Sequence, residues 1–499
     1  MRPVGDRLRC TAAAAALVAV AAAPAVAATY RVGPGEPYRQ LNDLPALAPG
    51  DEVEVVGGAT YAGDVVFDDP GAPDRPIVVR GVRVDGRPPV IAGGDTTVEF
   101  RANHYVFEGF AVTGGSRRCV FHHAHDITIR DSVVYDCPGH GILGADDDSG
   151  SLTLSYVEVH DCGDGERHHQ IYMATDEDAY PGAVFRMEHC YVHDGRGGNN
   201  VKSRAERNEI YYNWIEGAAY HEVELIGPDG ASESLAREDS EVACNVIRKT
   251  GPNAAFYAVR VGGDGTGQTW GRYRFVNNTF VLAGDARAAV RVFDGIDSLE
   301  LHNNAFVRAG GGGVRVCDMS SAAWAQGERA YGRTNWLPDE ATGVPQGLVD
   351  SRRGADPRLE DVAGGDLRPA DGSPLIDAGT DMPPTGDAAP FPRPLDACAY
   401  LPPPRRLEAV GAAVRRPRAG AIDIGAYEFG AERPGAVDAG PDGAGGGGGA
   451  GTTTDGGAGS GAPVGGGCGC RAGAADGPGA WWPGALAVGL RRRRRRRSR

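Results

Sequence analysis

The sequence predicts an all-β protein that folds as a right-handed parallel β-helix, a solenoid of roughly ten coils. Three observations support this prediction. A short phrase of the form apolar-x-x-polar-x-apolar recurs along the chain, and its copies begin 22 to 33 residues apart. The segments between the copies are rich in Val, Ile, Phe, Asn and Gly and show no helical periodicity. Repeats of this length are typical of stacked units, and crossovers between parallel strands are generally right-handed.

The repeated phrase predicts which residues lie above one another. Strands in a sheet are about 4.8 Å apart, so residues at equal repeat positions become neighbours on successive coils. Asparagines at one such position predict a hydrogen-bonded ladder in the turns. The clear copies begin at Ile129, Leu154, Met187, Ile210, Val242, Phe275 and Leu301, a degenerate copy begins at Phe107, and the asparagines are Asn213, Asn245, Asn278 and Asn304.

The composition divides the chain into a folded body and two different ends. Residues 1–28 have the arginines, the apolar run and the small-residue cleavage pattern of a secretory signal. The body is expected over 29–430, with regular coils over about 75–317 and an irregular closure over 318–430. A Gly-rich linker over 431–467 leads to a tail over 468–499, where two cysteines precede a short apolar segment and an arginine cluster.

This tail resembles the C-terminal sorting signals of myxobacterial surface proteins. The resemblance implies that a processing or sorting protease cuts the tail and that the protein is displayed at the cell surface, with the arginines first held in the cytoplasm. We therefore expect a secreted monomer anchored at the outer surface of a diderm bacterium. The alternative is a plain secreted protein with a decayed tail.

Charge and cysteine content narrow the possible partners. The formal net charge is −15, and the basic residues of the two ends make the body more acidic still. This argues against nucleic acid as a partner, although a local patch could still bind an anionic substrate. Export permits disulfides, and Cys137 and Cys162 share a repeat position on adjacent coils, which predicts a bridge between them. The alternative is a stack of reduced thiols.

A second short strand follows each repeated phrase and presents the candidate site. If its Val and Ile residues point inward, alternate residues point outward. The outward residues are Leu143, Tyr172, Lys202, Glu224, Arg260, Arg291 and Arg315, and a second column two residues before each inward residue contains His140, His169, Asn199, His221 and Tyr257. Lys202 lies in the middle of the outward set and is one of only two lysines, with Lys249.

This cluster could bind and polarise an acidic sugar and supply a base and an acid. The catalytic candidates are Lys202, His169, His221 and Arg260. The substrate-binding candidates are Tyr172, Asn199, Arg204, Glu224, Tyr257 and Arg291. The alternative is an ordinary polar sheet face on which Lys202 and Glu224 form a cross-strand pair.

Acidic residues follow two of these strands at matching positions. Asp147 and Asp148 follow one strand, and Asp176 and Glu177 follow the next. Stacked carboxylates repel one another unless a cation lies between them, and clusters of oxygen ligands suit Ca²⁺. We therefore expect a Ca²⁺ site there. The alternative is two solvated acidic loops. A Zn²⁺ ion bound by His140, His169 and His221 is a weaker alternative, because the sequence has no close ligand spacing to support it.

The segment Asn200–Asn213 (NVKSRAERNEIYYN) resembles the lysine coil of β-helix polysaccharide lyases that act on alginate and dermatan sulfate. The resemblance implies that Lys202 is the base that removes the proton next to the uronate carboxyl, with an arginine one coil later as acid and Ca²⁺ neutralising the carboxylate. The sequence departs from that pattern, because Glu224 occupies the expected arginine position and Arg260 lies one coil further on. Histidines stand where calcium carboxylates are expected.

Two functional classes follow. The first is a carbohydrate-active enzyme, a polysaccharide lyase or a glycoside hydrolase, that acts on uronate-containing polysaccharide around Lys202. The second is a non-catalytic surface β-helix that binds glycans or extracellular matrix. The clustered Lys, His, Tyr and Glu favour the first class, and the missing acid arginine and calcium carboxylates favour the second.

Overall fold

The computed structural model describes residues 27–432, except 146, 228–237, 251–255, 264–268, 270, 294, 320–328, 382, 384–390, 392–393 and 396. The predicted signal peptide, apart from its last two residues, lies outside the described residues. The predicted linker and sorting tail also lie outside them, apart from residues 431 and 432. Within the described ranges, no helix has the length and apolar character needed to cross a membrane.

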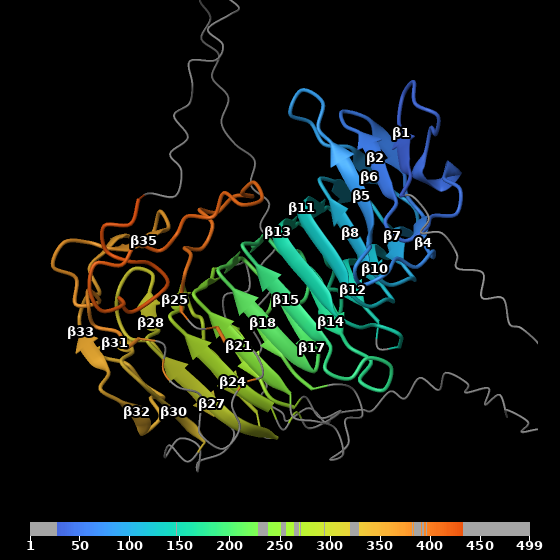
Figure 1. Cartoon of the computed structure of the whole chain (residues 1–499). Helices are drawn as coiled ribbons and strands as arrows, with labels where there is room; N and C mark the ends of the chain where they lie inside the picture. Colours follow the sequence, from blue (N-terminus) through green and yellow to red (C-terminus); the bar gives the residue numbers. More distant parts are fainter. Residues whose placement is uncertain are drawn as a thin grey trace, which may run out of the picture. The chain divides into compact units, whose positions relative to one another are not determined.

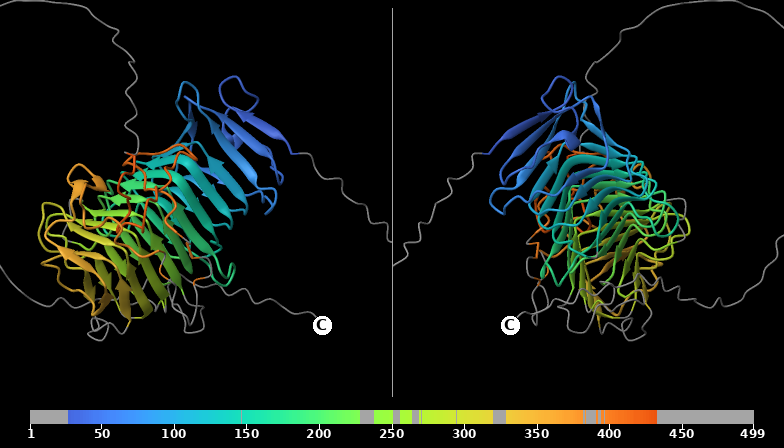
Figure 2. Two further views of the ribbon diagram at one scale, coloured as in Figure 1. Left: turned by 60° about the vertical axis from the view of Figure 1, so that its left-hand side comes forward. Right: turned by 90° about the vertical axis from the view of Figure 1, so that its right-hand side faces the viewer.

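The folded body is a right-handed parallel β-helix, as the sequence predicts (Figures 1 and 2). The described strands form one parallel sheet of 23 strands, one parallel sheet of ten strands and a two-stranded antiparallel sheet. The large sheet contains two series of strands, and the ten-stranded sheet is a third series. Each full coil contributes one strand to each series, so three faces surround a common core.

The first series begins each coil. Its strands are β1 (Thr29–Val32), β2 (Glu52–Val56), β5 (Ile77–Val82), β8 (Tyr105–Glu108), β11 (Ile127–Tyr135), β13 (Leu152–His160), β15 (Val184–Glu188), β18 (Arg207–Tyr211), β21 (Asp239–Ala243), β24 (Gly271–Val276), β27 (Ile296–His302), β30 (Ala330–Arg333) and β32 (Gly347–Val349). The long strands β11 and β13 continue into the second series. Figure 1 shows β11 to β27 side by side in chain order.

The second series contains β3 (Thr60–Ala62), β6 (Val90–Ala92), β9 (Ala111–Thr113), β16 (Tyr191–His193), β19 (Trp214–Glu216), β22 (Val246–Lys249), β25 (Thr279–Leu282), β28 (Ala305–Arg308), β31 (Trp336–Pro338) and β33 (Arg352–Gly354). The third series contains β4 (Val65–Phe67), β7 (Thr96–Phe100), β10 (Arg118–His122), β12 (His140–Gly144), β14 (Ile171–Ala174), β17 (Val201–Arg204), β20 (Val223–Leu225), β23 (Val259–Val261), β26 (Val290–Val292) and β29 (Cys317–Met319). The 3-10 helix η1 (Leu41–Asp43) lies near the N-terminal end, and β34 (Leu359–Asp361) pairs with β35 (Asp366–Pro369).

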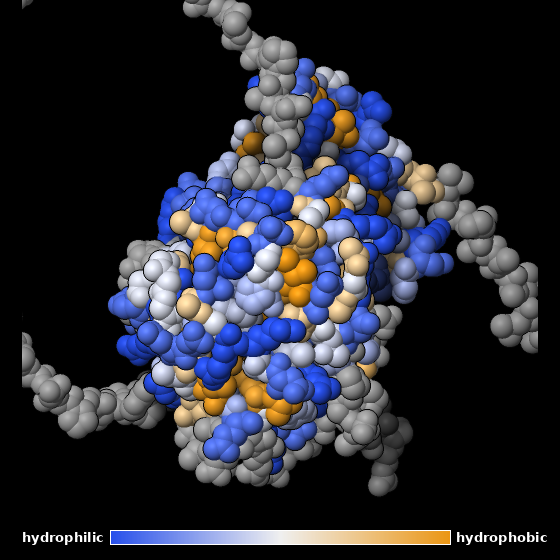
Figure 3. Space-filling model, turned by 90° about the vertical axis from the view of Figure 1, so that its left-hand side faces the viewer, coloured by the Kyte–Doolittle hydropathy of each residue, from blue (hydrophilic) through white to orange (hydrophobic). Residues whose placement is uncertain are grey.

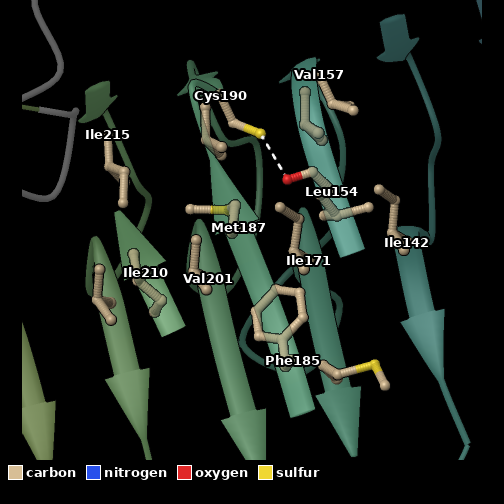
Figure 4. Close-up of a cluster of buried hydrophobic side chains, with 14 of the residues drawn as sticks. Ile142, Leu154, Val157, Ile171, Phe185, Met187, Cys190, Val201, Ile210 and Ile215 are labelled. Atoms are coloured by element: carbon tan, nitrogen blue, oxygen red, sulfur yellow. Dashed lines mark hydrogen bonds between the residues drawn. The ribbon is translucent and has the colours of Figure 1, made fainter. Parts of the chain in front are cut away.

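The register of the first series confirms the repeat alignment. The predicted first residues of the phrase pair in order from Phe107 through Ile129 and Leu154 to Leu301. These side chains are buried and form rows inside the coils, as Figure 4 shows for Leu154, Met187 and Ile210. Full burial of each such side chain contributes about 1.5–3 kcal/mol of transfer free energy.

The predicted asparagine ladder is present and is one rung longer than expected. The backbone N–H of Asn213 donates to Oδ1 of Asn245 at 2.8 Å, and the pattern continues through Asn278 and Asn304 to Asn335. The residue before each asparagine bends the chain with a positive φ, for example 57° at Tyr212. The asparagine side chains satisfy the backbone groups that these bends leave without strand partners.

The coils extend beyond the predicted range at both ends. They begin with β2 and continue to β33, which ends at Gly354, rather than spanning about 75–317. The chain then folds back as a segment that we call the C-terminal strap (residues 355–432). Its Leu367, Leu401 and Tyr427 pack against Tyr191 and Trp214 on the second series. In Figure 2 the orange and red strap crosses the green strands.

The strap removes apolar side chains of the second series from solvent. In the view of Figure 3, onto the side that lies at the left of Figure 1, the remaining apolar residues form separate patches among polar ones. A disulfide between Cys244 and Cys398 ties the strap to the coils across 154 residues of sequence. The sequence analysis did not predict this bond.

The predicted Cys137–Cys162 bridge is wrong. Cys137 forms a disulfide with Cys119 instead, at a Cα–Cα distance of 5.9 Å. Cys162 is a buried free thiol that donates to the carbonyl of His160 at 3.2 Å. Stacked residues on parallel coils have nearly parallel Cα–Cβ vectors, whereas a bridge needs side chains that point toward each other.

Candidate functional site

The outward residues of the third series form one continuous column, which we call the Lys202 column. It runs in register through Glu99, Phe121, Leu143, Tyr172, Lys202, Glu224, Arg260, Arg291 and Asp318. The inward neighbours such as Val201 are fully buried, which confirms the predicted facing of these strands. The prediction for Arg315 is wrong, because β29 begins at Cys317 and places Asp318 on the rung above Arg291.

The second predicted set also lies together, and we call it the histidine column: His140, His169, Asn199, His221 and Tyr257. The backbone N–H of His169 donates to Nδ1 of His140 at 3.1 Å, and that of Asn199 donates to Nδ1 of His169 at 2.9 Å. The N–H of His221 donates to Oδ1 of Asn199 at 3.0 Å. The side chains of His140, His169 and Asn199 therefore each accept a hydrogen bond from the backbone of the next coil.

These hydrogen bonds fix the proton positions on two histidines. A ring nitrogen that accepts an N–H cannot carry a proton, so the proton of neutral His140 and His169 is on Nε2. Burial lowers the pKa of His140 to about 4, and the neighbouring His168 lowers it further. Burial and the charge of Lys202 lower the pKa of His169 to about 2. Both rings are therefore neutral hydrogen-bond donors at neutral pH.

His221 has the opposite arrangement. Its Nδ1 lies 3.1 Å from the backbone carbonyl oxygen of Tyr257, so Nδ1 must carry the proton. Burial lowers the pKa of His221 to about 4, and the ring is neutral. Its Nε2 therefore keeps a lone pair, and among these three histidines His221 is the one able to accept a proton at Nε2.

At the centre of the Lys202 column, Glu224 binds three neighbours. Its Oε2 is 3.8 Å from Nζ of Lys202 and accepts a 2.6 Å hydrogen bond from Nδ2 of Asn199, while its Oε1 pairs with Nη1 of Arg260. Burial alone would raise the pKa of Glu224, but the charges of Arg260 and Lys202 outweigh burial and the net pKa is lowered. Glu224 is therefore an anion that positions both cations.

Tyr172 lies one rung from Lys202 and is held by Arg204, which is on the same strand as Lys202. Nε of Arg204 donates to the Tyr172 hydroxyl at 3.0 Å, and Nη1 of Arg204 donates to the carbonyl of Gly227 at 2.6 Å. Nζ of Lys202 lies 4.8 Å from the centre of the Tyr172 ring. Arg204 is only 4% exposed, so it orients Tyr172 rather than offering a binding surface of its own.

At the C-terminal end of the Lys202 column, the polar side chains also form hydrogen bonds and ion pairs with one another. The Tyr257 hydroxyl donates to Asp318 at 2.8 Å, and Nη1 of Arg291 lies 3.3 Å from the same carboxylate. The guanidinium groups of Arg260 and Arg291 both lie over the ring of Phe293, at 4.4 and 4.5 Å. The sequence analysis missed Phe293 and Asp318, because Phe293 follows the strand and Asp318 depends on the shifted register.

The predicted residues thus come together with a net positive charge. Lys202, Arg204, Arg260 and Arg291 outnumber the carboxylates Glu224 and Asp318. The whole chain has a formal charge of −15. We call these positive side chains the cationic strip. On a protein that is acidic overall, such a strip concentrates anionic ligands.

Behind the histidine column lies an inward polar set that the sequence analysis missed. Nε2 of Gln170 donates to Oδ1 of Asn200 at 2.8 Å, and Nδ2 of Asn200 donates to Glu222 at 2.7 Å. Glu222 faces Lys249, whose Nζ donates to the carbonyl of Ala218 at 2.9 Å. These residues could have been found from the sequence, because Gln170, Asn200 and Glu222 each directly follow a member of the histidine column.

The acidic loops make local hydrogen bonds. The carboxylate of Asp176 accepts from the backbone N–H groups of Asp148 and Ala179, each at 2.9 Å. Glu177 accepts from the Thr175 hydroxyl at 2.8 Å. Among the residues that the structure describes, no group of three or more His, Cys, Asp or Glu side chains is arranged to hold a metal ion. Ca²⁺ binding by Asp147, Asp148, Asp176 and Glu177 stays a prediction.

Comparisons with solved structures find carbohydrate-active β-proteins. Pectate lyase Pel9A is 12% identical, with 81% of this chain and 96% of that chain covered and a TM-score of 0.46. An alginate lyase from Paenibacillus sp. str. FPU-7 is 16% identical, covering 62% and 92%, with a TM-score of 0.37. The GH136 lacto-N-biosidase from Eubacterium ramulus is 12% identical, covering 63% and 67%, with a TM-score of 0.40. No family model and no curated protein matches the chain.

Proposed function

We propose that this protein is an exported, surface-displayed enzyme that binds uronate-containing polysaccharide along the Lys202 column and cleaves it by β-elimination. The observation that supports this proposal most directly is the cationic strip on an acidic chain, with one lysine at its centre and neutral histidines beside it. Positive side chains on three of four consecutive coils, Lys202, Arg260 and Arg291, suit a polymer with a negative charge on its sugar units.

The proposed reaction uses Lys202 as the base. After Lys202 releases a proton to solvent, its amine takes the proton from the carbon next to the uronate carboxyl, the electron pair forms a carbon–carbon double bond, and the bond to the leaving sugar oxygen breaks; Lys202 then returns the proton it took to solvent. The leaving oxygen takes a proton from the Tyr172 hydroxyl, which solvent later restores. Nε of Arg204 donates to that hydroxyl oxygen at 3.0 Å and stabilises it as its proton leaves.

Other side chains bind and orient the sugar in this proposal. The neutral Nε2–H groups of His140 and His169 donate to sugar oxygens, and Arg260 and Arg291 attract the carboxylates. Glu224 and Asn199 hold Lys202 and Arg260 in place rather than contacting substrate, because their polar atoms bond within the site.

A non-catalytic glycan-binding role is the second candidate. The contact between Lys202 and Glu224 favours it, because a carboxylate at 3.8 Å favours the protonated lysine, which cannot act as a base. The two candidates differ in one product, an unsaturated uronate that only β-elimination makes.

The test is incubation of the purified protein with alginate, pectate and unsulfated and sulfated glycosaminoglycans, with and without Ca²⁺. Ultraviolet absorbance of the unsaturated product is followed for the wild type, Lys202→Ala, Lys202→Arg and Tyr172→Phe, with Arg31→Ala as a control for loss of a distant surface charge. Product lost in Lys202→Ala and Lys202→Arg but not in Arg31→Ala supports elimination. If no uronate polysaccharide gives an absorbance signal but the protein still binds one of them, the result supports the second candidate.

A further inference from the structure

A cavity of about 490 Å³ lies on the same sheet as Lys202, nearer the N-terminal end. Its lining includes Glu99 and Arg101 around β7, and also His123 and Tyr180. Glu99 belongs to the Lys202 column, four rungs from Lys202 through Phe121, Leu143 and Tyr172. At about 4.8 Å per rung, Glu99 and Lys202 are roughly 19 Å apart along one face, a span that one oligosaccharide can bridge.

The walls of this cavity are preformed. The Tyr180 ring stacks on His125 at 4.7 Å with an interplanar angle of 7°, and its hydroxyl donates to Oδ1 of Asn103 at 3.4 Å. The loop that carries Tyr180 is fixed to the neighbouring coil by the bond from the Asp148 N–H to Asp176. The volume lies in the range of small-ligand sites, which are concave and bind through a few fixed polar groups.

The charge of the cavity is opposite to that around Lys202. Asp68, Glu99 and Asp148 line it, and one guanidinium, Arg101, offsets Glu99 through hydrogen bonds of 2.8 and 2.9 Å. Burial lowers the pKa of His123, so that ring adds no positive charge at neutral pH. Ionised carboxylates accept hydrogen bonds and cannot donate them, so they bind hydroxyl and amide donors and repel carboxylates and sulfates.

Between Glu99 and Lys202, two of the three intervening outward residues of the Lys202 column are apolar. Phe121 and Leu143 point outward on the intervening rungs, and the Arg118 guanidinium lies 3.5 Å from the centre of the Phe121 ring. The side chains of Phe121 and Leu143 suit the carbon-bearing faces of sugar rings. One face of the protein therefore runs from an acidic cavity across an apolar stretch to a cationic strip.

We propose that the cavity is a distal saccharide subsite for a neutral sugar, without carboxylate or sulfate, of the same chain whose uronate lies at Lys202. This inference rests on the proposed function and narrows its substrate to an unsulfated heteropolysaccharide that contains both neutral and uronate units. A polymer of uronate alone would place a carboxylate against Asp68, Glu99 and Asp148.

The test compares hexasaccharides by isothermal titration calorimetry on the full folded protein. One is a homo-oligouronate, one alternates uronate with a neutral sugar, and a third set contains neutral xylo-, manno-, gluco- and galacto-oligosaccharides. We expect the wild type to prefer the alternating ligand by about tenfold over the homo-oligouronate. Asp148→Asn and Glu99→Gln should lower this affinity ratio toward one, because they strengthen binding of the homo-oligouronate. The control Glu54→Gln, on the distant first series, should leave the ratio unchanged.

The outcomes separate the two proposals. An unchanged ratio in Asp148→Asn and Glu99→Gln, or an initial preference for the homo-oligouronate, overturns the subsite. Absence of uronate binding by the wild type counts against the proposed function. In that case the proposed subsite is supported only if a neutral oligosaccharide binds and Asp148→Asn weakens its binding at least several-fold. If no neutral oligosaccharide binds, the subsite is overturned.

Discussion

The side chain of Lys202 lies against that of Glu224, with Nζ 3.8 Å from Oε2, and Glu224 in turn binds Arg260 and Asn199. A buried carboxylate shared by two cations couples the stability of the site to its charge. Removing one member of such a group leaves the others uncompensated in a region with little solvent.

Glu224→Gln should therefore destabilise the fold. We expect a loss of about 3 kcal/mol in the free energy of unfolding, because Arg260 loses a buried partner. Chemical denaturation measures the change, and Glu54→Gln, whose partner Arg31 is largely exposed, is the matched control with an expected change below about 1 kcal/mol. Equal stability of the two variants would contradict the buried network.

The strap should depend on its disulfide. Cys398→Ser opens the bond to Cys244, which closes a loop of 154 residues, and loops of this length predict a loss of about 4–5 kcal/mol in the chain-entropy account. Under reducing conditions the free energy of unfolding of the wild type should approach that of the Cys398→Ser variant. Peptide mapping should find Cys119 joined to Cys137 and Cys162 as a thiol; a Cys137–Cys162 peptide would contradict the structure.

The three histidines of the histidine column should contribute stability that rises with pH between about 4 and 6.5. The pKa values of His140, His169 and His221 are lowered to about 4, 2 and 4, so the unfolded chain binds more protons in this window and acid favours unfolding. Glu222 opposes this trend, because burial raises its pKa to about 7 and its contribution is lost as pH rises through that value. Burial likewise raises the pKa of Glu408 to about 7 and lowers the pKa values of His122 and His189 to about 4, so the melting temperature as a function of pH measures the net of opposing contributions.

His169 offers a sharper version of that experiment. Asn199 on the next coil accepts the following backbone N–H through Oδ1, so His169→Asn can make the same kind of bond without titrating. We expect His169→Asn to flatten the slope and to retain more stability than His169→Ala at pH 7. A slope unchanged in both variants would show that His169 does not titrate on unfolding.

The asparagine ladder should be a main source of coil stability. Asn245 donates to the carbonyls of Ile210 and Ala243 and accepts the N–H of Asn213 within a fully buried turn. Asn245→Ala leaves these groups without partners and should lower the free energy of unfolding by about 2–4 kcal/mol. A loss below about 1 kcal/mol, measured by denaturation, would contradict the ladder's role.

The coil stack could be predicted because its register depends on a local pattern. The apolar residues from Ile129 to Leu301 recur at one repeat position, and burial of that position sets the pairing of every coil. The Lys202 column follows from the same register. Arg315 was misplaced because Gly310–Gly313 lengthen the turn, so that the similar pattern Val314-Arg315-Val316 precedes the strand instead of forming it.

Contacts made by segments outside the sequence repeat could not be predicted from the sequence. The strap has no repeat, and the Cys244–Cys398 bond joins residues that only the folded chain brings together. The partner of Cys137 depended on side-chain direction rather than on repeat position. The acidic cavity is formed by residues in and after the third-series strands of five successive coils, and its shape depends on how the loop that carries Tyr180 packs.

The most direct test of the account is the formation of unsaturated uronate by the wild type and by Lys202→Ala on the same polysaccharide. The account predicts an ultraviolet signal that grows with time in the wild type and is reduced at least a hundredfold in Lys202→Ala, since a positioned base contributes about 10²–10⁴ in rate. Equal signals in both proteins, or none in the wild type on any uronate polysaccharide, would contradict it.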